Sequence, residues 1–441
     1  MAYKVALISL GCAKNLVDSE QMLCLMNDAG IEIVPEADGA DAVIVNTCGF
    51  IDSAKMEAIE TILSLGEMKA AGKLKRIIVA GCLSERYKEQ LLDEMPEIDA
   101  IVGVGSYTEI VGVIEKSLEG SEKTAVFGDI DAPYAEEGRI VSTGGAWAYI
   151  KIAEGCDNRC AYCVIPSLRG RYRSRPMESV INEAEALAAS GIRELIVIAQ
   201  DITRYGTDLY GRRALGDLLE KLCAIDGLKW IRLHYLYPDE IDDALIDVIA
   251  REDKILKYLD IPIQHINDKI LKLMNRRGTG TEIRTLFTKL RERIPGVVLR
   301  TSLITGLPGE GEAEFEELCE FLREAKIERA GVFPYSPEEG TPAEAMERVG
   351  EDVAAARAER VMEIQDRVME EYNASRIGTE TEVLCEGRDE ERGFFFGRSF
   401  AESPDIDGRI LFTGDDIEPE RFYKVNITGE IDGEPVGRRI R

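Results

Sequence analysis

Three cysteines within eight residues constrain this chain more than any other feature of its sequence. They form the pattern Cys156-x-x-x-Cys160-x-x-Cys163 within the segment 151–175. Three thiolates this close can converge on one iron–sulfur cluster, which usually has four protein ligands, so one iron would stay open to another ligand. Structural or disulfide-bonded cysteines rarely crowd so tightly, and nothing indicates an oxidising compartment. Zinc would need a fourth Cys or His at similar spacing, and neither follows nearby.

A repeating strand–helix pattern surrounds these cysteines. Six βα units predict a parallel, partly closed barrel, in which chemistry takes place at the carboxyl ends of the strands. The Cys156–Cys163 loop follows the first strand, so it is expected on that face. The expected strands are 149–153, 195–199, 230–233, 258–261, 297–304 and 330–333, with helices between them.

The first 118 residues also alternate between strands and helices, which predicts a parallel sheet covered on both faces. Its strands are expected at 4–10, 42–46, 76–80 and 101–104. Cys12, Cys48 and Cys82 each follow one of the first three strands. Because carboxyl ends of parallel strands share one edge, these cysteines should meet in space and form a second metal site. Each has a glycine beside it, which would let the backbone approach a bulky cofactor; the alternative is three separate buried thiols.

The predicted fold class is α/β with a further small β-domain. Residues 119–145 are rich in Gly, Ser and acidic residues, which indicates a linker with a short strand at 124–127. After a long charged helix at 353–375, short alternating runs predict a small antiparallel β-barrel of about five strands. The predicted division is an N-terminal domain 1–118, a linker 119–145, a barrel domain 146–374 and a β-domain 375–441.

The chain has 441 residues and a formal charge of −28. This charge argues against broad contact with a phosphate backbone, so no DNA partner is expected, and it favours a basic protein or a small molecule. The N-terminus lacks a signal peptide, and no apolar run is long enough to span a bilayer. We therefore expect a cytoplasmic protein without a membrane partner. Ten cysteines in that compartment suit metal ligands or buried thiols.

A three-cysteine cluster with an open iron can bind S-adenosylmethionine, and four residues are candidates for contacting it. Tyr162, between the last two cysteines, could pack on the adenine or be a core aromatic. Gly306, in TGLPGE after the fifth strand, could let a small ligand approach or form a plain turn. Arg171 belongs to a run of four arginines that could hold a carboxylate or phosphate, or could be exposed without a partner. Arg300 lies on the fifth strand.

The remaining cysteines and the two histidines are expected to be structural. The other cysteines fall within expected helices or a strand and should be buried apolar residues; they are Cys24, Cys223, Cys319 and Cys385. His234 and His265 lie near the carboxyl ends of barrel strands. A role in the site is open for His234.

Taken together, the motifs resemble those of the radical S-adenosylmethionine superfamily. The additional N-terminal cysteines and the C-terminal β-domain resemble the methylthiotransferases, over essentially the whole chain. Members that act on tRNA typically carry Gln-Met-Asn after the first cysteine and Asn-Thr-Cys-Ala-Val-Arg as the second motif. This chain has GCAKNLVDSE at 11–20, NTCGFIDSAK at 46–55 and HYLYP at 234–238. These motifs are similar to the branch that modifies ribosomal protein 12 of the small subunit.

The resemblance implies two [4Fe–4S] clusters and S-adenosylmethionine as cofactors. The cluster on Cys156, Cys160 and Cys163 would cleave S-adenosylmethionine to a 5′-deoxyadenosyl radical, which removes a hydrogen from the β-carbon of one aspartate. The cluster on the three N-terminal cysteines would deliver an already methylated sulfur to that carbon. The substrate would be ribosomal protein 12, free or within the ribosome, and an electron donor such as flavodoxin or ferredoxin is implied.

The C-terminal domain resembles the TRAM fold, which often binds RNA. Here residues 377–441 contain nine basic and 16 acidic residues, a net charge of −7. This charge favours docking to a very basic ribosomal protein. It counts, with the local motifs, against the runner-up hypothesis of a tRNA methylthiotransferase. A non-enzymatic iron–sulfur carrier or electron-transfer protein is a further alternative, but it needs neither a barrel nor an open iron.

Overall fold

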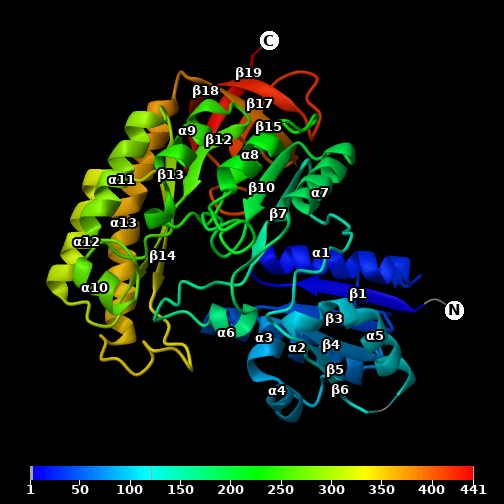
Figure 1. The fold of residues 1–441 in the computed structure, drawn as a ribbon. Helices are drawn as coiled ribbons and strands as arrows, with labels where there is room; N and C mark the ends of the chain where they lie inside the picture. The colour runs from blue at the N-terminus through cyan, green and yellow to red at the C-terminus, as the bar shows by residue number, and fades with distance from the viewer. Residues whose placement is uncertain (1–2, 121, 441) are drawn as a thin grey trace.

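The computed structural model describes residues 3–120 and 122–440. In Figure 1 a central α/β domain separates an N-terminal parallel sheet from a small C-terminal β-barrel, which lie at its opposite ends. This arrangement confirms the predicted α/β class with an additional β-domain. Among the described helices, none has both the length and the apolar character needed to cross a bilayer.

The N-terminal sheet has six parallel strands in the order β2-β1-β3-β4-β5-β6. Its inner strand β3 is buried along all six residues, of which the first four are apolar, as expected when helices cover both faces. The predicted alternation of strands and helices is confirmed. The additional strand β2 was not predicted, because it has only two residues and both are exposed. The strands are β1 (Lys4–Ser9), β2 (Glu32–Ile33), β3 (Ala42–Thr47), β4 (Arg76–Gly81), β5 (Ala100–Val102) and β6 (Thr124–Val126).

Helices pack on both faces of this sheet. One face carries α1 and α5, which bury Met22, Met26 and Ile114 against the strands. The other face carries α2, α3 and α4, which bury Ile62 and Leu83. The helices are α1 (Ala13–Asp28), α2 (Asp52–Ala70), α3 (Cys82–Tyr87), α4 (Glu89–Glu94) and α5 (Ile110–Glu119), with a 3₁₀ turn at Val104–Glu109.

The central domain is an open, six-stranded parallel sheet in the order β14-β13-β12-β11-β10-β7. Its order follows the chain from one edge to the other, as in a partly closed barrel, and so confirms the six predicted βα units. The strands are β7 (Trp147–Lys151), β10 (Glu194–Ile198), β11 (Trp230–Leu233), β12 (Ile255–Asp260), β13 (Val298–Thr305) and β14 (Arg329–Pro334). A small antiparallel pair, β8 (Ala153–Glu154) and β9 (Arg173–Ser174), flanks the cysteine loop.

The helices of the central domain cover the outer face of the sheet, except for α6, which packs beside α3 of the N-terminal domain (Figure 1). Side chains such as Val197, Leu259 and Leu299 point to this face and form the largest apolar core of the molecule with the helices. The long charged helix α13 also packs on β14 and α12. The helices are α6 (Ile165–Arg169), α7 (Met177–Ala189), α8 (Leu215–Cys223), α9 (Asp243–Arg251), α10 (Asp268–Leu273), α11 (Gly280–Arg293), α12 (Glu312–Ala325) and α13 (Glu351–Arg376), with a 3₁₀ turn at Pro238–Glu240.

The C-terminal domain is a closed five-stranded barrel, as predicted, in the order β15-β16-β17-β19-β18. Closure leaves it without a free sheet edge, and its β17–β19 pair is parallel whereas the other pairs are antiparallel. The strands are β15 (Glu380–Asp389), β16 (Phe394–Arg398), β17 (Ile410–Thr413), β18 (Phe422–Ile431) and β19 (Glu434–Arg439).

The segment 399–407, between β16 and β17, packs against the inner face of the central sheet. The buried Arg232 guanidinium donates to the carbonyl oxygens of Phe400 and Ser399 at 2.8 and 3.2 Å. The hydroxyl of Tyr258 donates to Asp407. Thus the C-terminal domain fills part of the barrel interior, and its docking depends on buried polar contacts.

His234 contributes to this docking and gives a pH prediction. Its Nε2 lies 3.0 Å from the hydroxyl oxygen of Ser403, and burial lowers its pKa from 6.5 to about 3. The folded protein therefore keeps His234 neutral while the unfolded chain protonates it, so stability falls as the pH drops below 6.5 and continues to fall until about pH 3. Between pH 7 and pH 5 this loss is about 2 kcal/mol.

Urea unfolding at pH 7 and pH 5 measures the effect. His234→Gln cannot take up this proton, so the variant should lose about 2 kcal/mol less than the wild type over the same pH interval. Equal losses in the two proteins would show that His234 does not cause the acid sensitivity.

Candidate iron–sulfur and S-adenosylmethionine site

Cys12, Cys48 and Cys82 lie at the carboxyl ends of three adjacent strands, β1, β3 and β4. Cys12 is the N-cap residue of α1, and Cys82 is the first residue of α3. The positive end of a helix dipole stabilises an anion at such a position, which suits thiolates. The structure thus brings these three predicted residues to one edge of the sheet, although 70 positions separate them in the chain.

Glycines allow the three turns to pack against one another. A Cβ atom on Gly11 would lie 2.7 Å from the Cβ of Cys48, and one on Gly49 would lie 2.8 Å from the carbonyl oxygen of Cys82. Gly81 has a φ of 91°, and a Cβ there would lie 2.3 Å from Oδ1 of Asn46. The glycines therefore permit the contact between neighbouring turns. Their role in the approach to a cofactor stays a prediction.

Two thiols of the N-terminal set, those of Cys48 and Cys82, are partly or fully buried, whereas Cys12 is exposed. Burial, together with the nearby Cys82 and Cys12, raises the pKa of Cys48 to about 12. Burial also raises the pKa of Cys82, although the Arg169 guanidinium opposes the shift. Three converging thiols with adjacent positive charge fit a metal cluster that holds them as thiolates.

The Cys156–Cys163 loop follows β7 at the carboxyl edge of the central sheet, as predicted. Backbone hydrogen bonds fix the loop: Cys156 N–H donates to the Gly170 carbonyl at 3.1 Å, and Cys163 N–H donates to the Cys160 carbonyl at 3.0 Å. Burial raises the pKa of Cys156 to about 11 and also raises that of Cys163.

Arg276 is the cation that faces this loop. Its Nη1 lies 3.9 Å from Sγ of Cys160 and donates to the Tyr162 hydroxyl at 3.3 Å, and its guanidinium lies 4.3 Å from the centroid of the Tyr237 ring. The Tyr237 hydroxyl is 3.7 Å from Sγ of Cys160. A buried arginine beside the Cys160 thiol fits an anionic thiolate-bound cluster on this loop.

Neither cysteine set has the geometry of a single-ion site. Within the described residues, no three His, Cys, Asp or Glu side chains converge closely enough to hold one metal ion. An iron–sulfur cluster binds each thiolate at a different iron, so its ligands need not meet at one point. The donor sets therefore fit clusters better than zinc.

The two cysteine sets belong to one continuous interface between the N-terminal and central domains. Helix α6 begins two residues after Cys163, and its Leu168, with the preceding Val164, packs against Cys82. The residues directly after Cys163 therefore contact Cys82, so the two cysteine sets are neighbours in space.

A buried network of charged side chains joins the two domains beside this interface. The Arg169 guanidinium donates to Asp18 and to Glu154, both at 3.0 Å. The Lys151 ammonium donates to the same two carboxylates, at 2.7 Å to Glu154. Two cations thus balance two carboxylates, which buried charges require. Arg169 also donates to Oδ1 of Asn15, which lies 3.8 Å from Sγ of Cys82.

The four residues predicted to contact S-adenosylmethionine lie in different surroundings, and their role stays a prediction. Tyr162 is buried beside Cys160 and Cys163. Arg171 is 80% exposed next to Asp131. Arg300 pairs with Asp260 at 2.7 Å and lies 3.7 Å from Asp407 of the C-terminal domain. A Cβ on Gly306 would lie 2.4 Å from that of Ala354 in α13, so the glycine permits this close packing.

Several residues beside the site were not singled out from the sequence. Lys14 is buried and its ammonium lies 3.1 Å from the centroid of the Tyr235 ring. Arg276 and Arg169 contact the two cysteine sets. Lys14 could have been identified from the sequence by its position two residues after Cys12. No sequence pattern identifies Arg276, which reaches the site from the turn after α10. Cys319 and Cys385 are buried as predicted, whereas the prediction is wrong for the partly exposed Cys24 and Cys223.

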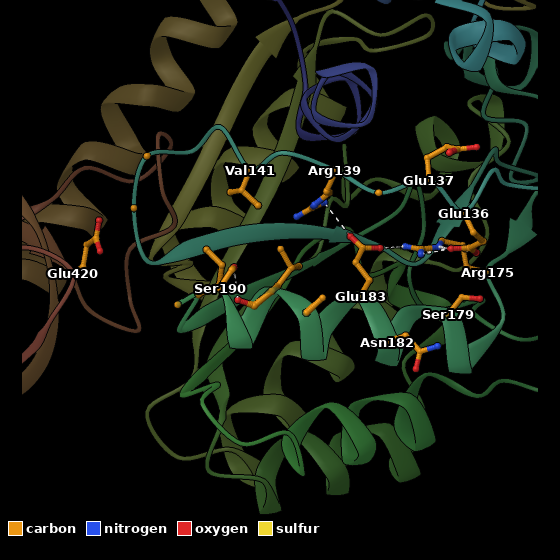
Figure 2. Close-up of a pocket in the computed structure, with 17 residues that line it drawn as sticks. Glu136, Glu137, Arg139, Val141, Arg175, Ser179, Asn182, Glu183, Ser190 and Glu420 are labelled. Carbon is orange, nitrogen blue, oxygen red and sulfur yellow. Dashed lines mark hydrogen bonds and ion pairs between the residues drawn. The ribbon is translucent and has the colours of Figure 1, made fainter. Parts of the chain in front are cut away.

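A groove of about 900 Å³ lies elsewhere, between the segment 136–145 and α7. Figure 2 shows Arg175 directed toward Glu136 and Glu183, and Arg139 directed toward Glu183. The Arg175–Glu183 and Arg139–Glu183 distances are 2.5 and 3.2 Å. These charges therefore satisfy one another, and none of the six candidate cysteines lines the groove.

Three family descriptions match the chain in the order of its structural parts. The Uncharacterized protein family UPF0004 matches residues 4–103, the Radical SAM superfamily matches residues 150–322, and the TRAM domain matches residues 377–440. The cysteine sets fall within the first two matches.

Curated proteins similar to this chain carry the name ribosomal protein uS12 methylthiotransferase RimO. That of Lachnoclostridium phytofermentans is 50% identical over 439 residues, which are 98% of this chain and 99% of that protein. That of Geobacter sulfurreducens is 49% identical over 99% of this chain and 98% of that protein. That of Clostridioides difficile is 46% identical over 98% of each.

Solved structures share the fold at low sequence identity. The radical S-adenosylmethionine methyltransferase TsrM from Kitasatospora setae has a TM-score of 0.59 at 16% identity and covers 78% of this chain and 77% of its own. The cobalamin-dependent S-adenosylmethionine radical enzyme OxsB has a TM-score of 0.52 at 12% identity, over 84% of this chain and 56% of its own. On the near-full-length identity to its relatives, the chain belongs to the ribosomal protein uS12 methylthiotransferase family of the radical SAM superfamily.

Proposed function

We propose that this protein methylthiolates the β-carbon of an aspartate in ribosomal protein uS12. The observation that carries the proposal is the meeting of two three-cysteine sets at one interface, each at the carboxyl edge of a parallel sheet. One set alone accounts for S-adenosylmethionine cleavage. The second set accounts for a sulfur donor, which a methylthio transfer needs in addition.

Each cluster has an assigned set of ligands in this proposal. Cys156, Cys160 and Cys163 hold the cluster that binds S-adenosylmethionine, and Cys12, Cys48 and Cys82 hold the other. When bound, the clusters supply the electron that cleaves S-adenosylmethionine and the sulfur that is transferred. The protein positions both cysteine sets, places Arg276 and Arg169 against the thiolates, and excludes water by packing Val164 and Leu168 between them.

The charge of the C-terminal barrel supports a protein substrate. This domain carries a net charge of −7, and a positively charged RNA-binding surface is not expected from that composition. An acidic surface is complementary to a basic ribosomal protein. The strands of the barrel lie at the end of the central domain opposite the N-terminal sheet (Figure 1), although segment 399–407 reaches into the central sheet. The barrel strands therefore suit a docking element for the substrate protein.

The proposal includes partners that the substrate and chemistry require. A low-potential electron donor such as flavodoxin or ferredoxin would reduce the clusters, and the reaction would take place in the cytoplasm on uS12, either free or in the ribosome.

Incubation of the reduced, iron-reconstituted protein with S-adenosylmethionine and either uS12 or tRNA tests the substrate. We expect uS12 to gain the mass of one methylthio group and tRNA to stay unmodified. Methylthiolated tRNA with unmodified uS12 would favour the tRNA-modifying alternative. Failure to form 5′-deoxyadenosine would favour the iron–sulfur carrier or electron-transfer alternative.

A further inference from the structure

Lys14 is a buried cation without a carboxylate partner in the described parts of the chain. Its side chain is 6% exposed. Within residues 3–120 and 122–440 its ammonium has neither an ion pair nor a hydrogen bond, and its close contact is the face of the Tyr235 ring. A cation–π contact offsets only part of the cost of removing an ammonium from water. Lys14 therefore lacks the anion that buried lysines normally pair with.

The neighbouring buried cations differ from Lys14 because carboxylates match them. Lys151 and Arg169 share Asp18 and Glu154. Across the interface, Arg300 pairs with Asp260 at 2.7 Å. Each of these carboxylates contacts another cation, and none of them lies within ion-pair distance of the Lys14 ammonium in the described residues.

The position of Lys14 relates this charge to both cysteine sets. It lies at the start of α1, two residues after Cys12, and Cys12 itself is exposed. Tyr235, which it faces, follows β11 at the carboxyl edge of the central sheet, the edge that also carries the Cys156–Cys163 loop. Lys14 thus lies where the sulfur-donating edge of one domain meets the radical-forming edge of the other.

Tyr235, whose ring contacts Lys14, has an unusual backbone conformation. Its φ of 64° places it in the left-handed region, which non-glycine residues rarely occupy and which is often found at functional sites. Its N–H donates to Oδ2 of Asp260 at 3.1 Å, and this bond holds the conformation. The aromatic ring that contacts Lys14 therefore belongs to a residue with a strained backbone conformation.

We propose that the Lys14 ammonium binds the side-chain carboxylate of the substrate aspartate. The carboxylate would supply the direct partner that the Lys14 ammonium lacks, and it would hold the adjacent β-carbon between the two cysteine sets. This inference rests on the proposed function, because it assigns the substrate group recognised at the same site. Lys14 is a specificity-determining residue in this account.

A double comparison of enzyme and substrate tests this pair. Binding of the reconstituted full-length protein, in the presence of S-adenosylmethionine, is measured with uS12 that carries the target aspartate and with uS12 in which this residue is Asn. The wild-type enzyme should bind the Asp form about 10- to 100-fold more tightly, as is typical when a charged hydrogen bond is lost. Lys14→Met removes the charge but keeps an unbranched side chain, and it should bind the two forms equally.

Lys75→Met is the matched control variant. Lys75 precedes β4 at the opposite edge of the N-terminal sheet, is 71% exposed and pairs with Asp41. This variant should keep the wild-type preference for Asp. The iron content of Lys14→Met shows whether this variant still assembles both clusters. If it does not, the test relies on the wild-type enzyme and its affinities for the Asp and Asn forms of uS12. Equal affinities for the two forms would overturn the inference.

The outcomes separate this inference from the proposed function. A wild-type enzyme that methylthiolates uS12, together with a Lys14→Met variant that still prefers Asp, would refute the role of Lys14 alone. A Lys14→Met variant that loses affinity for S-adenosylmethionine while preserving the Asp preference would assign the ammonium to the cofactor carboxylate and would also overturn the inference. A wild-type enzyme that leaves uS12 unmodified would refute the proposed function itself.

Discussion

Replacement of Cys156, Cys160 and Cys163 together by Ala is expected to abolish formation of 5′-deoxyadenosine while the protein keeps about half of its iron. The wild-type protein should hold about eight irons, four in each [4Fe–4S] cluster. The triple variant removes the ligands of one cluster, and the Cys12, Cys48 and Cys82 set on the other sheet remains. Iron analysis of anaerobically reconstituted protein and chromatography of the nucleoside product measure the two effects.

The reciprocal variant and a cysteine control complete this prediction. Replacement of Cys12, Cys48 and Cys82 by Ala should also remove about half of the iron, but 5′-deoxyadenosine should still form and methylthiolation should cease. Replacement of the partly exposed Cys24 and Cys223 by Ala should keep the full iron content, because both lie away from the two sets. Full iron content in either triple variant would contradict the ligand assignment.

Glu154→Gln is expected to destabilise the protein by about 3–5 kcal/mol, the usual cost of breaking a buried ion pair on one side. Glu154 is buried and accepts hydrogen bonds from Lys151 at 2.7 Å and from Arg169 at 3.0 Å. The variant leaves two buried cations with only the carboxylate of Asp18 between them. The free energy of unfolding in urea measures the loss, and the cluster-free protein can be used so that iron binding does not contribute.

Glu382→Gln is the control for an exposed pair. Glu382 accepts from Lys229 at 2.6 Å, but both side chains are more than a third exposed, so the expected loss is at most about 1 kcal/mol. If Glu154→Gln lost no more stability than this control, the charged network would not contribute to the attachment of the N-terminal domain to the barrel.

The sequence predicted the fold of all three parts because each has a strong local pattern. Apolar strands at regular spacing, such as β3 and β4, identify a parallel sheet, and the alternating runs near the C-terminus identify a barrel. Parallel topology then brings the carboxyl ends of β1, β3 and β4 to one edge, so the meeting of Cys12, Cys48 and Cys82 could be expected without coordinates.

Contacts between domains could not be predicted in the same way. The partners of Arg169 come from α1 and from β8, and neither periodicity nor motif spacing relates these elements. The packing of segment 399–407 inside the barrel depends on how two domains dock, as does the pairing of Arg300 with Asp407. That Lys14 has no direct ion pair is visible only after the partners of every neighbouring cation are known.

The most direct test of the account uses uS12 that carries deuterium on the β-carbon of the target aspartate. The reduced enzyme is incubated with this protein and S-adenosylmethionine, and both products are examined by mass spectrometry. Deuterium is expected in 5′-deoxyadenosine, and the same aspartate is expected to gain a methylthio group. Methylthiolated uS12 together with 5′-deoxyadenosine free of deuterium would contradict the account.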